Sequence, residues 1–591
     1  MPDYFLSGQY HCGYNKKFHR KVRNWSSNWD YRNSAVEIFI LTIAAKQCYN
    51  FYKQKIVKIS LEERWFLFMG LYLNPGNEGF FESVSSKIYV DKTELIQYTN
   101  QVFRTKQKFL CVSRPRRFGK SMAAEMLAAY YQRNCDSQKL FANMNIAKDP
   151  SFPVHLNKYN TIFLNMQDFF SRTHNIDKMC ELFSKYVLRD LLREYPDLDY
   201  LDQTDLIDVL QEIYREYKIP FVFIIDEWDC IFRENKNDME AQKKYLDFLR
   251  NLLKDRNYVG LTYMTGILPI KKYGSHSALN MFDEFSMTNP GALAEYVGFT
   301  ENEVKELCGQ FDMSFEDTKR WYDGYYFEKI GHVYNPRSVV SAMLSHSFDN
   351  YWNKTETFEA LRDYIVMNYK GLKESIIELL AGKRLEIDIS SFNNDMTTFS
   401  SADDVLTLFI HLGYLGYDFS RKEAFIPNSE ITTEFITSIR DAGWQEVVTA
   451  IRNSEELLRA TWKLDNTVVA EKIQEAHFET SILKYNDENA LACVISLAYY
   501  SARAYYTEIR ELPSGKGFAD IVYLPRKEHL DKPAMIIELK WDKSADSAIQ
   551  QIKERNYPQA LKAYCGNLLM VGINYDTKTK EHECIIEKLD M

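Results

Sequence analysis

The stretch that decides the fold runs from residue 108 to residue 127 and reads KFLCVSRPRRFGKSMAAEML. It begins with a short apolar run, passes through an arginine-rich turn, and continues with apolar residues at helical spacing. Gly119, Lys120 and Ser121 match the second half of a phosphate-binding loop, in which the lysine reaches the phosphates and the hydroxyl meets Mg²⁺. Arg114 stands where such a loop has its first glycine. The stretch therefore predicts a strand, a phosphate-binding turn, and a helix whose positive N-terminal end faces an anion.

Strand and helix patterns alternate from about residue 85 to residue 270. Apolar runs typical of buried strands occupy 160–166, 220–229 and 258–267, and helical spacing covers 120–132 and 205–217. Buried apolar strands that alternate with helices predict a parallel sheet covered on both faces. The expected fold class is therefore α/β, with a P-loop NTPase-type parallel sheet in this part of the chain.

Acidic residues stand at the end of the strand predicted at 220–229. The run reads FVFIIDEWD and includes Asp226 and Glu227. In P-loop ATPases the first acid and the loop hydroxyl, here Ser121, hold Mg²⁺, and the next acid polarises the attacking water. Thr265, at the end of the following strand, is placed to sense the γ-phosphate. The alternative is that the two acids only end a buried strand, but their occurrence together with the loop favours a nucleotide site.

The arginines of the loop need a separate explanation. Arginine does not easily adopt positive φ, so the loop geometry must differ where Arg114 replaces glycine. Arg114, Arg116 and Arg117 either bind phosphate directly or pair with the acids at 226–229. We expect nucleotide binding rather than fast turnover. The residues expected to bind ATP are Arg116, Arg117, Gly119, Lys120, Ser121, Asp226 and Thr265.

A second set of polar residues lies near the C-terminus. The runs GKGFADIVYLP (515–525) and MIIELKW (535–541) predict two strands, with Asp520 on the first and Glu538 and Lys540 on the second. Glu538 and Lys540 are two residues apart and so share one face of their strand. Metal-dependent phosphodiesterases use two carboxylates to hold Mg²⁺ and a lysine to orient or activate water. The alternative is an ordinary Glu–Lys pair on a solvated strand.

Six motifs together resemble the bacterial AAA-ATPase-like family with a C-terminal PD-(D/E)XK nuclease-like domain. They are IYVDKTELI (88–96), SRPRRFGKS (113–121), FIIDEWD (223–229), TGILPIKK (265–272), WYDGY (321–325) and YNPRSV (334–339). The resemblance covers about residues 69–585 and implies an ATPase module in which arginine at position 114 is the usual form of the loop. It also implies that the C-terminal domain is a restriction-endonuclease-like α/β fold. Gln551 and Glu488 match positions that this nuclease superfamily often uses to complete its site.

These patterns divide the chain into four parts. We expect an N-terminal extension at 1–68, a P-loop NTPase domain at 69–285, a helical and winged-helix-like region at 286–475, and a nuclease-like domain at 476–591. Either Met69 is the natural start or residues 1–68 form an appendage.

Composition limits the classes of partner. The 591 residues carry 73 Lys and Arg against 82 Asp and Glu, a net charge of −9, so any contact with nucleic acid must be a local basic surface. The ten cysteines show no metal-ligand spacing, which suits a reducing cytoplasm. The apolar run at 38–45 is too short to span a bilayer, and we expect no membrane contact. Nucleic acid and a second copy of the chain are the partners we consider.

Two functions fit these features. In the first, ATP and Mg²⁺ bind the P-loop domain and gate Mg²⁺-dependent cleavage of nucleic acid, with Asp520, Glu538, Lys540, Gln551 and Glu227 as the catalytic residues. In the second, the chain is a nucleotide-dependent switch that binds a partner or nucleic acid without cleaving it. The acidic net charge favours the second function modestly.

Overall fold

The computed structural model describes residues 70–591, apart from 274–275, 278, 353–357, 368, 480–487, 515–516, 555–560, 562–566 and 590–591. The extension expected at 1–68 and the start expected at Met69 lie outside the described residues. Among the helices of the described part, none combines the length and apolar character needed to cross a membrane.

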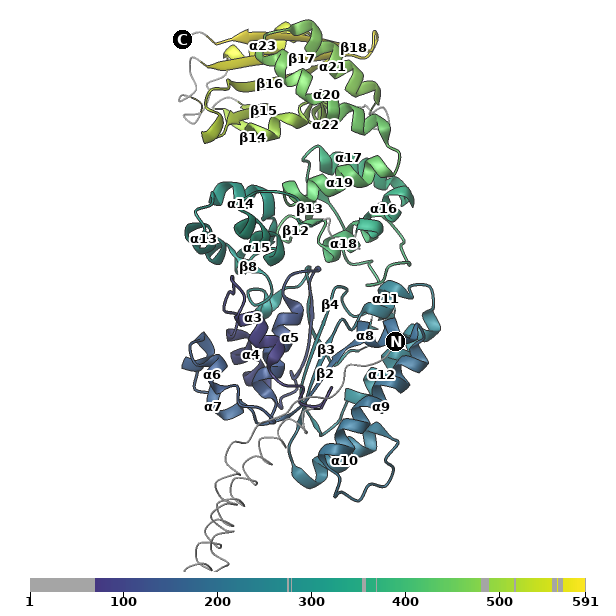
Figure 1. The fold of residues 1–591 in the computed structure, drawn as a ribbon. Helices are drawn as coiled ribbons and strands as arrows, with labels where there is room; N and C mark the ends of the chain where they lie inside the picture. Colours follow the sequence, from purple (N-terminus) through teal and green to yellow (C-terminus); the bar gives the residue numbers. More distant parts are fainter. Residues whose placement is uncertain are drawn as a thin grey trace, which may run out of the picture. The chain divides into compact units, whose positions relative to one another are not determined.

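A five-stranded sheet forms the centre of the first region (Figure 1). Its order is β2-β3-β4-β1-β7 and all four pairings are parallel, so the carboxyl ends of its strands meet at one edge. Strands β1, β3 and β4 are buried along their whole length, as their continuous apolar runs predict. The strands are β1 (Phe109–Ser113), β2 (Asn160–Asn165), β3 (Phe221–Asp226), β4 (Val259–Gly266) and β7 (Asp283–Phe285).

Helices cover both faces of this sheet. Helices α3, α4 and α5 lie on one side in Figure 1, and α8, α9, α11 and α12 lie on the other. Helix α5 starts directly after the loop and packs against β2, β3 and β4. The bounds are α3 (Glu78–Val84), α4 (Glu94–Val102), α5 (Lys120–Tyr131), α6 (Gln138–Phe141), α7 (Phe152–His155), α8 (Met166–Thr173), α9 (Ile176–Glu194), α10 (Leu206–Tyr217), α11 (Cys230–Glu234) and α12 (Met239–Leu253). This arrangement confirms the predicted α/β fold of the first region.

Helices and two small antiparallel sheets follow β7. The sheets have the orders β8-β10-β9 and β11-β13-β12. The region expected to be helical and winged-helix-like contains helix α18 followed by the β12–β13 hairpin. The strands are β8 (Phe299–Thr300), β9 (Tyr325–Phe327), β10 (Gly331–Tyr334), β11 (Leu385–Glu386), β12 (Gly416–Asp418) and β13 (Glu423–Phe425). The helices are α13 (Glu301–Gln310), α14 (Phe315–Tyr322), α15 (Pro336–Ser345), α16 (Phe358–Met367), α17 (Leu372–Leu380), α18 (Ala402–Leu412) and α19 (Ser429–Asp441).

A second five-stranded sheet, β14-β15-β16-β17-β18, forms the C-terminal region. Its β16–β17 pairing is parallel and the other pairings are antiparallel, which makes it a mixed sheet. Met535, Ile537 and Leu539 of β16 join the large core, whereas Ala534 and Ile536 join a smaller core with α23. The next even-numbered residues, Glu538 and Lys540, therefore lie on the α23 face. The elements are α22 (Glu488–Ala498), β14 (Tyr506–Ser514), β15 (Gly517–Pro525), β16 (Ala534–Trp541), α23 (Ala545–Glu554), β17 (Leu568–Asp576) and β18 (Glu581–Lys588).

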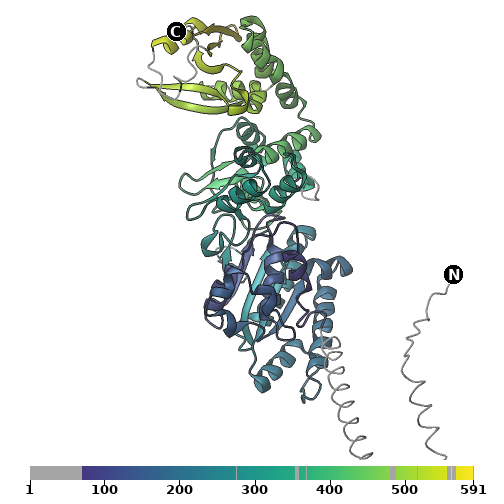
Figure 2. The same ribbon diagram turned by 60° about the vertical axis from the view of Figure 1, so that its left-hand side comes forward.

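Two long helices, α20 (Gln445–Trp462) and α21 (Asn466–Glu479), pack with this C-terminal sheet. The indole of Trp462 donates to the hydroxyl of Tyr506 on β14 at 2.7 Å, and Asn466 accepts from the backbone N–H of Ile586 on β18 at 3.0 Å. Figure 2 shows these green helices beside the yellow strands from a second direction. The packing groups α20 and α21 with the C-terminal sheet, although the expected boundary at 476 would leave most of both helices in the middle region.

Candidate functional site

In the loop between β1 and α5, the residues with left-handed backbone conformation lie near the C-terminal end of the loop. Gly119, the N-cap of α5, has φ 88°, and Arg117 has φ 68°. Arg114 is not among the residues with positive φ. Arginine can therefore replace glycine at position 114, because the left-handed residues of this loop are at positions 117 and 119 instead.

Asp226 is the centre of a polar cluster at the carboxyl edge of the parallel sheet. Its Oδ2 accepts from the Ser121 hydroxyl at 2.6 Å, and its Oδ1 accepts from the Thr265 hydroxyl. Because β4 lies between β1 and β3, Thr265 at the end of β4 is next to both neighbours. The sequence predicted these three residues as one cluster, and the structure brings all three together.

Glu227 lies beside this cluster in a left-handed conformation, with φ 52°. Burial raises the pKa of its carboxyl, and the positive charges of Lys120 and Arg233 oppose that rise. Arg233, on α11, forms ion pairs with Glu227 and, at 3.2 Å, with Asp229. A buried arginine thus fixes Glu227, the residue expected to polarise water. The sequence did not lead us to expect this role for Arg233, although it lies one helical turn after Asp229.

Lys120 is buried at the start of α5. Its ammonium donates to the carbonyl of Pro115 at 3.1 Å, across the loop. Burial lowers the pKa of Lys120, while Glu227, Asp226 and Asp229 oppose the decrease. A buried ammonium that is held by a neutral carbonyl and surrounded by acids is positioned to exchange that carbonyl for a phosphate oxygen.

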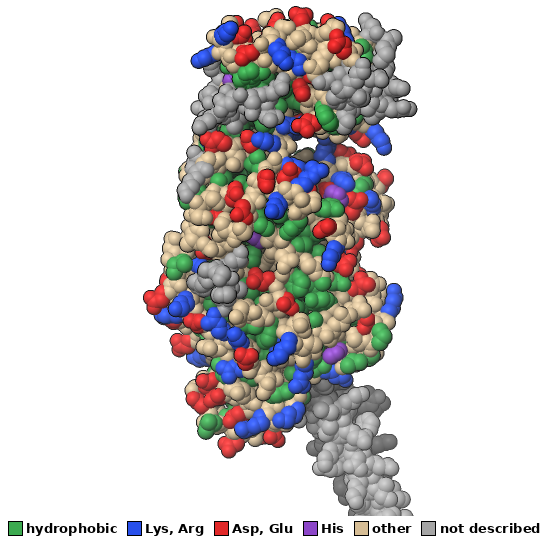
Figure 3. Space-filling view, turned by 180° about the vertical axis from the view of Figure 1, so that it is seen from behind, with side chains coloured by type: hydrophobic (Ala, Val, Ile, Leu, Met, Phe, Trp, Pro, Cys, Tyr) green, Lys and Arg blue, Asp and Glu red, His purple; other side chains and the backbone are tan. Residues whose placement is uncertain are grey.

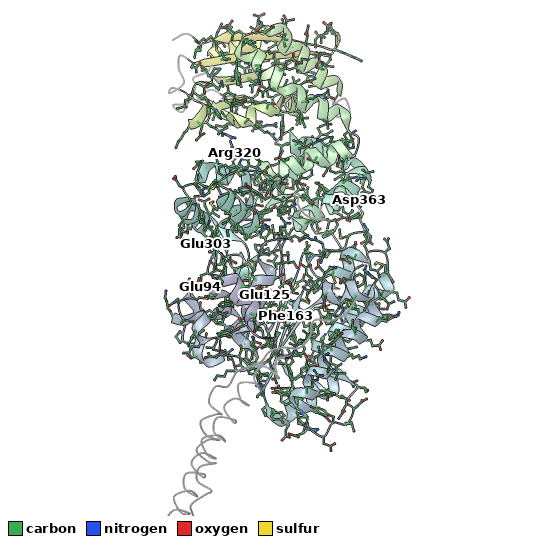
Figure 4. The ribbon with its side chains drawn as sticks, in the orientation of Figure 1. Glu94, Glu125, Phe163, Glu303, Arg320 and Asp363 are labelled. Carbon is green, nitrogen blue, oxygen red and sulfur yellow. The ribbon has the colours of Figure 1, made fainter. Side chains whose placement is uncertain are left out.

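A cavity of about 540 Å³ opens beside the loop. Its polar lining includes residues of the loop together with Glu227 and Arg337, the latter from α15. Lys92 is also in the wall and is held at 2.7 Å by Glu303 of α13, which is labelled in Figure 4. The apolar lining consists of Phe80, Ile88, Tyr89, Val90, Phe118, Met122, Ala123, Met126, Tyr296, Phe299, Pro336, Val340 and Leu344. A cavity lined by both basic groups and apolar side chains fits a nucleotide with its phosphates and its base.

The arginines of the loop have different surroundings. Arg116 and Arg117 line the cavity, as expected for phosphate-binding residues. Arg114 does not: its guanidinium is fully buried, donates to the carbonyls of Ser113 and Phe285 at 2.9 and 3.0 Å, and lies 5.3 Å from the centre of the Phe327 ring. For Arg114, both sequence interpretations, phosphate binding and pairing with the acids, were wrong. Burial also lowers its pKa to about 10.

The C-terminal site begins with two adjacent side chains on β16. Glu538 and Lys540 are 1% and 6% exposed, and their charged groups are 3.2 Å apart. Gln551, on α23, donates its amide to the same oxygen of Glu538. These contacts exclude the alternative of a solvated Glu–Lys pair, because both side chains are inside the domain.

Asp520 lies on the neighbouring strand, β15. Its Oδ2 accepts from the backbone N–H of Leu539, the residue between Glu538 and Lys540, at 2.7 Å. Glu488 begins α22, but its side chain lies outside the described residues. Two carboxylates on adjacent strands supply the hard oxygen ligands that Mg²⁺ prefers, so the donor set fits this ion. Within the described residues, no group of three or more His, Cys, Asp or Glu is placed to hold a metal.

On the face that Figure 3 shows, the described residues form no extended basic surface. Basic and acidic side chains of the described residues are interspersed over the face that Figure 3 shows. The observation agrees with the net charge of −9.

Comparison with known proteins assigns both domains. Residues 81–275 match the family model described as predicted AAA-ATPase, and residues 486–584 match the PD-(D/E)XK nuclease superfamily. The chain therefore joins an AAA-ATPase-like domain to a PD-(D/E)XK nuclease-superfamily domain. A protein of Azotobacter chroococcum mcd 1, described as an uncharacterized protein in the vnfD 5′ region, is 24% identical over 297 residues. That match covers 47% of this chain and about half, 52%, of the relative.

Two solved structures show weak likeness to the chain. The ORC2 protein of Aeropyrum pernix is 9% identical, with 60% of this chain and 97% of that one covered and a TM-score of 0.26. Cdc6p of Pyrobaculum aerophilum is 11% identical, with coverages of 62% and 98% and a TM-score of 0.21. The assignment of the two domains rests on the family models and on the sheets described above.

Proposed function

We propose that this protein binds ATP in its AAA-ATPase-like domain and, under the control of that nucleotide, cleaves phosphodiester bonds of nucleic acid in its C-terminal domain. The observation that carries the proposal is the convergence of Asp520, Glu538, Lys540 and Gln551 on one buried site. The four residues come from three elements, β15, β16 and α23, and their types are those of a phosphodiesterase site.

In the AAA-ATPase-like domain, each residue has a distinct part in nucleotide binding. Lys120 and the N–H groups at the start of α5 bind the β- and γ-phosphates, with Arg116 and Arg117 at the same end of the cavity. Ser121 and Asp226, already joined by a hydrogen bond, would hold Mg²⁺, which neutralises phosphate charge when bound. Glu227 orients water, and Thr265 senses the γ-phosphate. The ion pair of Glu227 with Arg233 favours binding over rapid turnover, since it competes with that role.

In the nuclease-superfamily domain, Asp520 and Glu538 would hold Mg²⁺. When bound there, the ion polarises the scissile phosphate and lowers the pKa of water. Lys540 orients the attacking water and stabilises negative charge on the phosphate, and Gln551 fixes the carboxylate of Glu538. The low exposure of Glu538 and Lys540 keeps the local dielectric low, which strengthens each of these interactions.

The test is a cleavage assay of the full chain on labelled single- and double-stranded DNA and on RNA, with Mg²⁺ or Mn²⁺, with and without ATP. We expect metal-dependent cleavage that an Asp520→Ala Glu538→Ala variant lacks. A matched control is Glu181→Gln, an exposed acid on α9 in the first region. No cleavage under any condition, or equal cleavage by the double variant, rules out the nuclease function.

A specific observation supports a second candidate function, a nucleotide-dependent switch that binds without cleavage. The described residues place only two carboxylates at the C-terminal site, and Lys540 occupies one of them in an ion pair. A nucleotide-dependent change in oligomeric state or in nucleic-acid binding, with no phosphodiesterase activity, would identify this function instead.

A further inference from the structure

The loop segment Arg114–Phe118, RPRRF, contacts the middle region at several points. This is the half of the loop that lacks the usual first glycine. Arg114 lies against Phe327 of β9, 5.3 Å from the ring centre, and its N–H donates to the Phe285 carbonyl at 3.0 Å. The residue at the replaced glycine position therefore connects the start of the loop to β9, the strand that begins at the last residue of the WYDGY motif.

Pro115 and Phe118 make apolar contacts with the same region. A Cβ atom at Gly413, at the end of α18, would come within 2.8 Å of the Pro115 side chain, so glycine there allows close packing of the loop. The ring of Phe118 meets Tyr325 of β9 edge-on at 5.3 Å, and the hydroxyl of Tyr325 donates to the Gly413 carbonyl. The loop thus packs against both β9 and the end of α18.

Arg117 makes a hydrogen bond to the middle region that a bound phosphate could replace. Its guanidinium donates to the backbone carbonyl of Tyr351 at 3.0 Å, and it lines the nucleotide cavity. The N–H of Tyr351 donates to Glu430, a buried acid on α19, at 2.7 Å. The two ends of one residue's backbone are therefore held by the phosphate-binding loop and by α19.

Helix α19 leads to the C-terminal domain. Its last residue is Asp441, and α20, which packs with the nuclease-superfamily sheet, begins at Gln445. A second link to α15 comes from the side chain of Tyr351, whose hydroxyl lies 2.5 Å from that of Ser345. Tyr351 is thus connected to the helix that carries Arg337 and to the helix that precedes α20.

We propose that Arg117, Tyr351 and Glu430 form a latch, a chain of hydrogen bonds that joins the phosphate-binding loop to α19. Nucleotide in the cavity would break this chain at the contact between Arg117 and Tyr351. The inference rests on the proposed function, because it needs a nucleotide in that cavity. Arg117 acts as a positioning residue: it reads the phosphate and releases or retains Tyr351.

Charge explains the direction of the exchange. Arg117 and Arg337 face the same cavity, and Arg337 acts with burial to lower the pKa of Arg117, so the two positive charges repel each other. A phosphate between them removes that repulsion. An arginine–phosphate contact joins opposite charges and can form two parallel hydrogen bonds, which a neutral carbonyl cannot do, so the nucleotide competes for Arg117 and releases the Tyr351 carbonyl. Release loosens residues 350–352 and the first turn of α19.

Hydrogen exchange of the full chain tests the latch. With a slowly hydrolysed ATP analogue and Mg²⁺, we expect amide exchange in 350–352 and 428–433 to increase at least fivefold in the wild type. Glu430→Ala should exchange rapidly there without nucleotide and respond less than twofold to the analogue, and Glu430→Gln, which keeps an acceptor, should respond like the wild type. Thr433→Ala, an exposed position on α19, is the matched control.

Titration calorimetry with the same analogue separates the two ideas. Binding of the analogue without a change of exchange in 350–352 and 428–433 overturns the latch and leaves the proposed nucleotide site intact. Absence of any binding removes the proposed function, and the latch with it.

Discussion

Glu430 gives the wild-type chain a pH dependence that a single substitution should remove. The carboxyl lies inside α19, and burial raises its pKa to about 7 from an ordinary 4.5, against the hydrogen bonds from Ser338, Tyr351 and Trp352. A carboxyl with a higher pKa in the folded state binds its proton more tightly when folded. Its stabilising contribution is therefore complete below pH 4.5 and is lost as the pH rises to about 7.

The size of this effect follows from the two pKa values. Each pH unit between them corresponds to about 1.4 kcal/mol, so the free energy of unfolding changes by about 3 kcal/mol in total. Most of this change should occur between pH 5 and pH 8. Glu430→Gln keeps the shape and an acceptor but does not titrate, so its stability should change less over the same range.

Urea unfolding at pH 5 and pH 8, followed by circular dichroism, measures the difference. The wild type should lose about 2–3 kcal/mol more than Glu430→Gln between the two pH values. Glu471→Gln, an exposed acid on α21, should behave like the wild type. Parallel pH dependence of the wild type and Glu430→Gln would refute the reasoning.

Three further substitutions test the two sites. Lys120→Ala should weaken ATP binding at least 100-fold by calorimetry, since it removes the buried ammonium; an unchanged affinity would exclude the loop as the phosphate site. Gly119→Ala should lower the free energy of unfolding in urea by about 1–2 kcal/mol, because φ 88° strains a residue with a Cβ although no atom lies within 4 Å of that Cβ; stability equal to the wild type would show that the loop relaxes to another backbone conformation. Lys540→Ala should reduce metal-dependent cleavage at least 100-fold with an unchanged circular dichroism spectrum, and full activity would remove Lys540 from the proposed mechanism.

The sequence predicted those strands and helices whose own residues carry a clear apolar pattern. The apolar run at 108–113 and the helical spacing at 120–132 match β1 and α5 to within one residue, because a buried strand and a helix capped by glycine leave strong local patterns. The three-residue strand β7 at the sheet edge has no such pattern, and the sequence did not predict it. The strand β18 was also missed, since its residues alternate between charged and partly buried positions.

The candidate sites were predictable where their residues lie in short motifs. Asp226, Ser121 and Thr265 were expected together and are joined by hydrogen bonds. Arg337 was missed as a cavity residue, although it stands within the quoted motif YNPRSV, because only the tertiary packing brings α15 to the loop. The surroundings of Arg114 could not be derived from its neighbours in sequence either, since Phe327 lies more than 200 positions further along the chain.

The central claim is that one chain joins a nucleotide site to a nuclease site. Its most direct test is the rate of Mg²⁺-dependent cleavage of labelled nucleic acid by the full chain, measured with and without saturating ATP. The account predicts cleavage whose rate ATP changes at least tenfold in the wild type, and neither cleavage nor an ATP effect in Asp520→Ala Glu538→Ala. Cleavage that is equal with and without ATP, or that persists in the double variant, would contradict it.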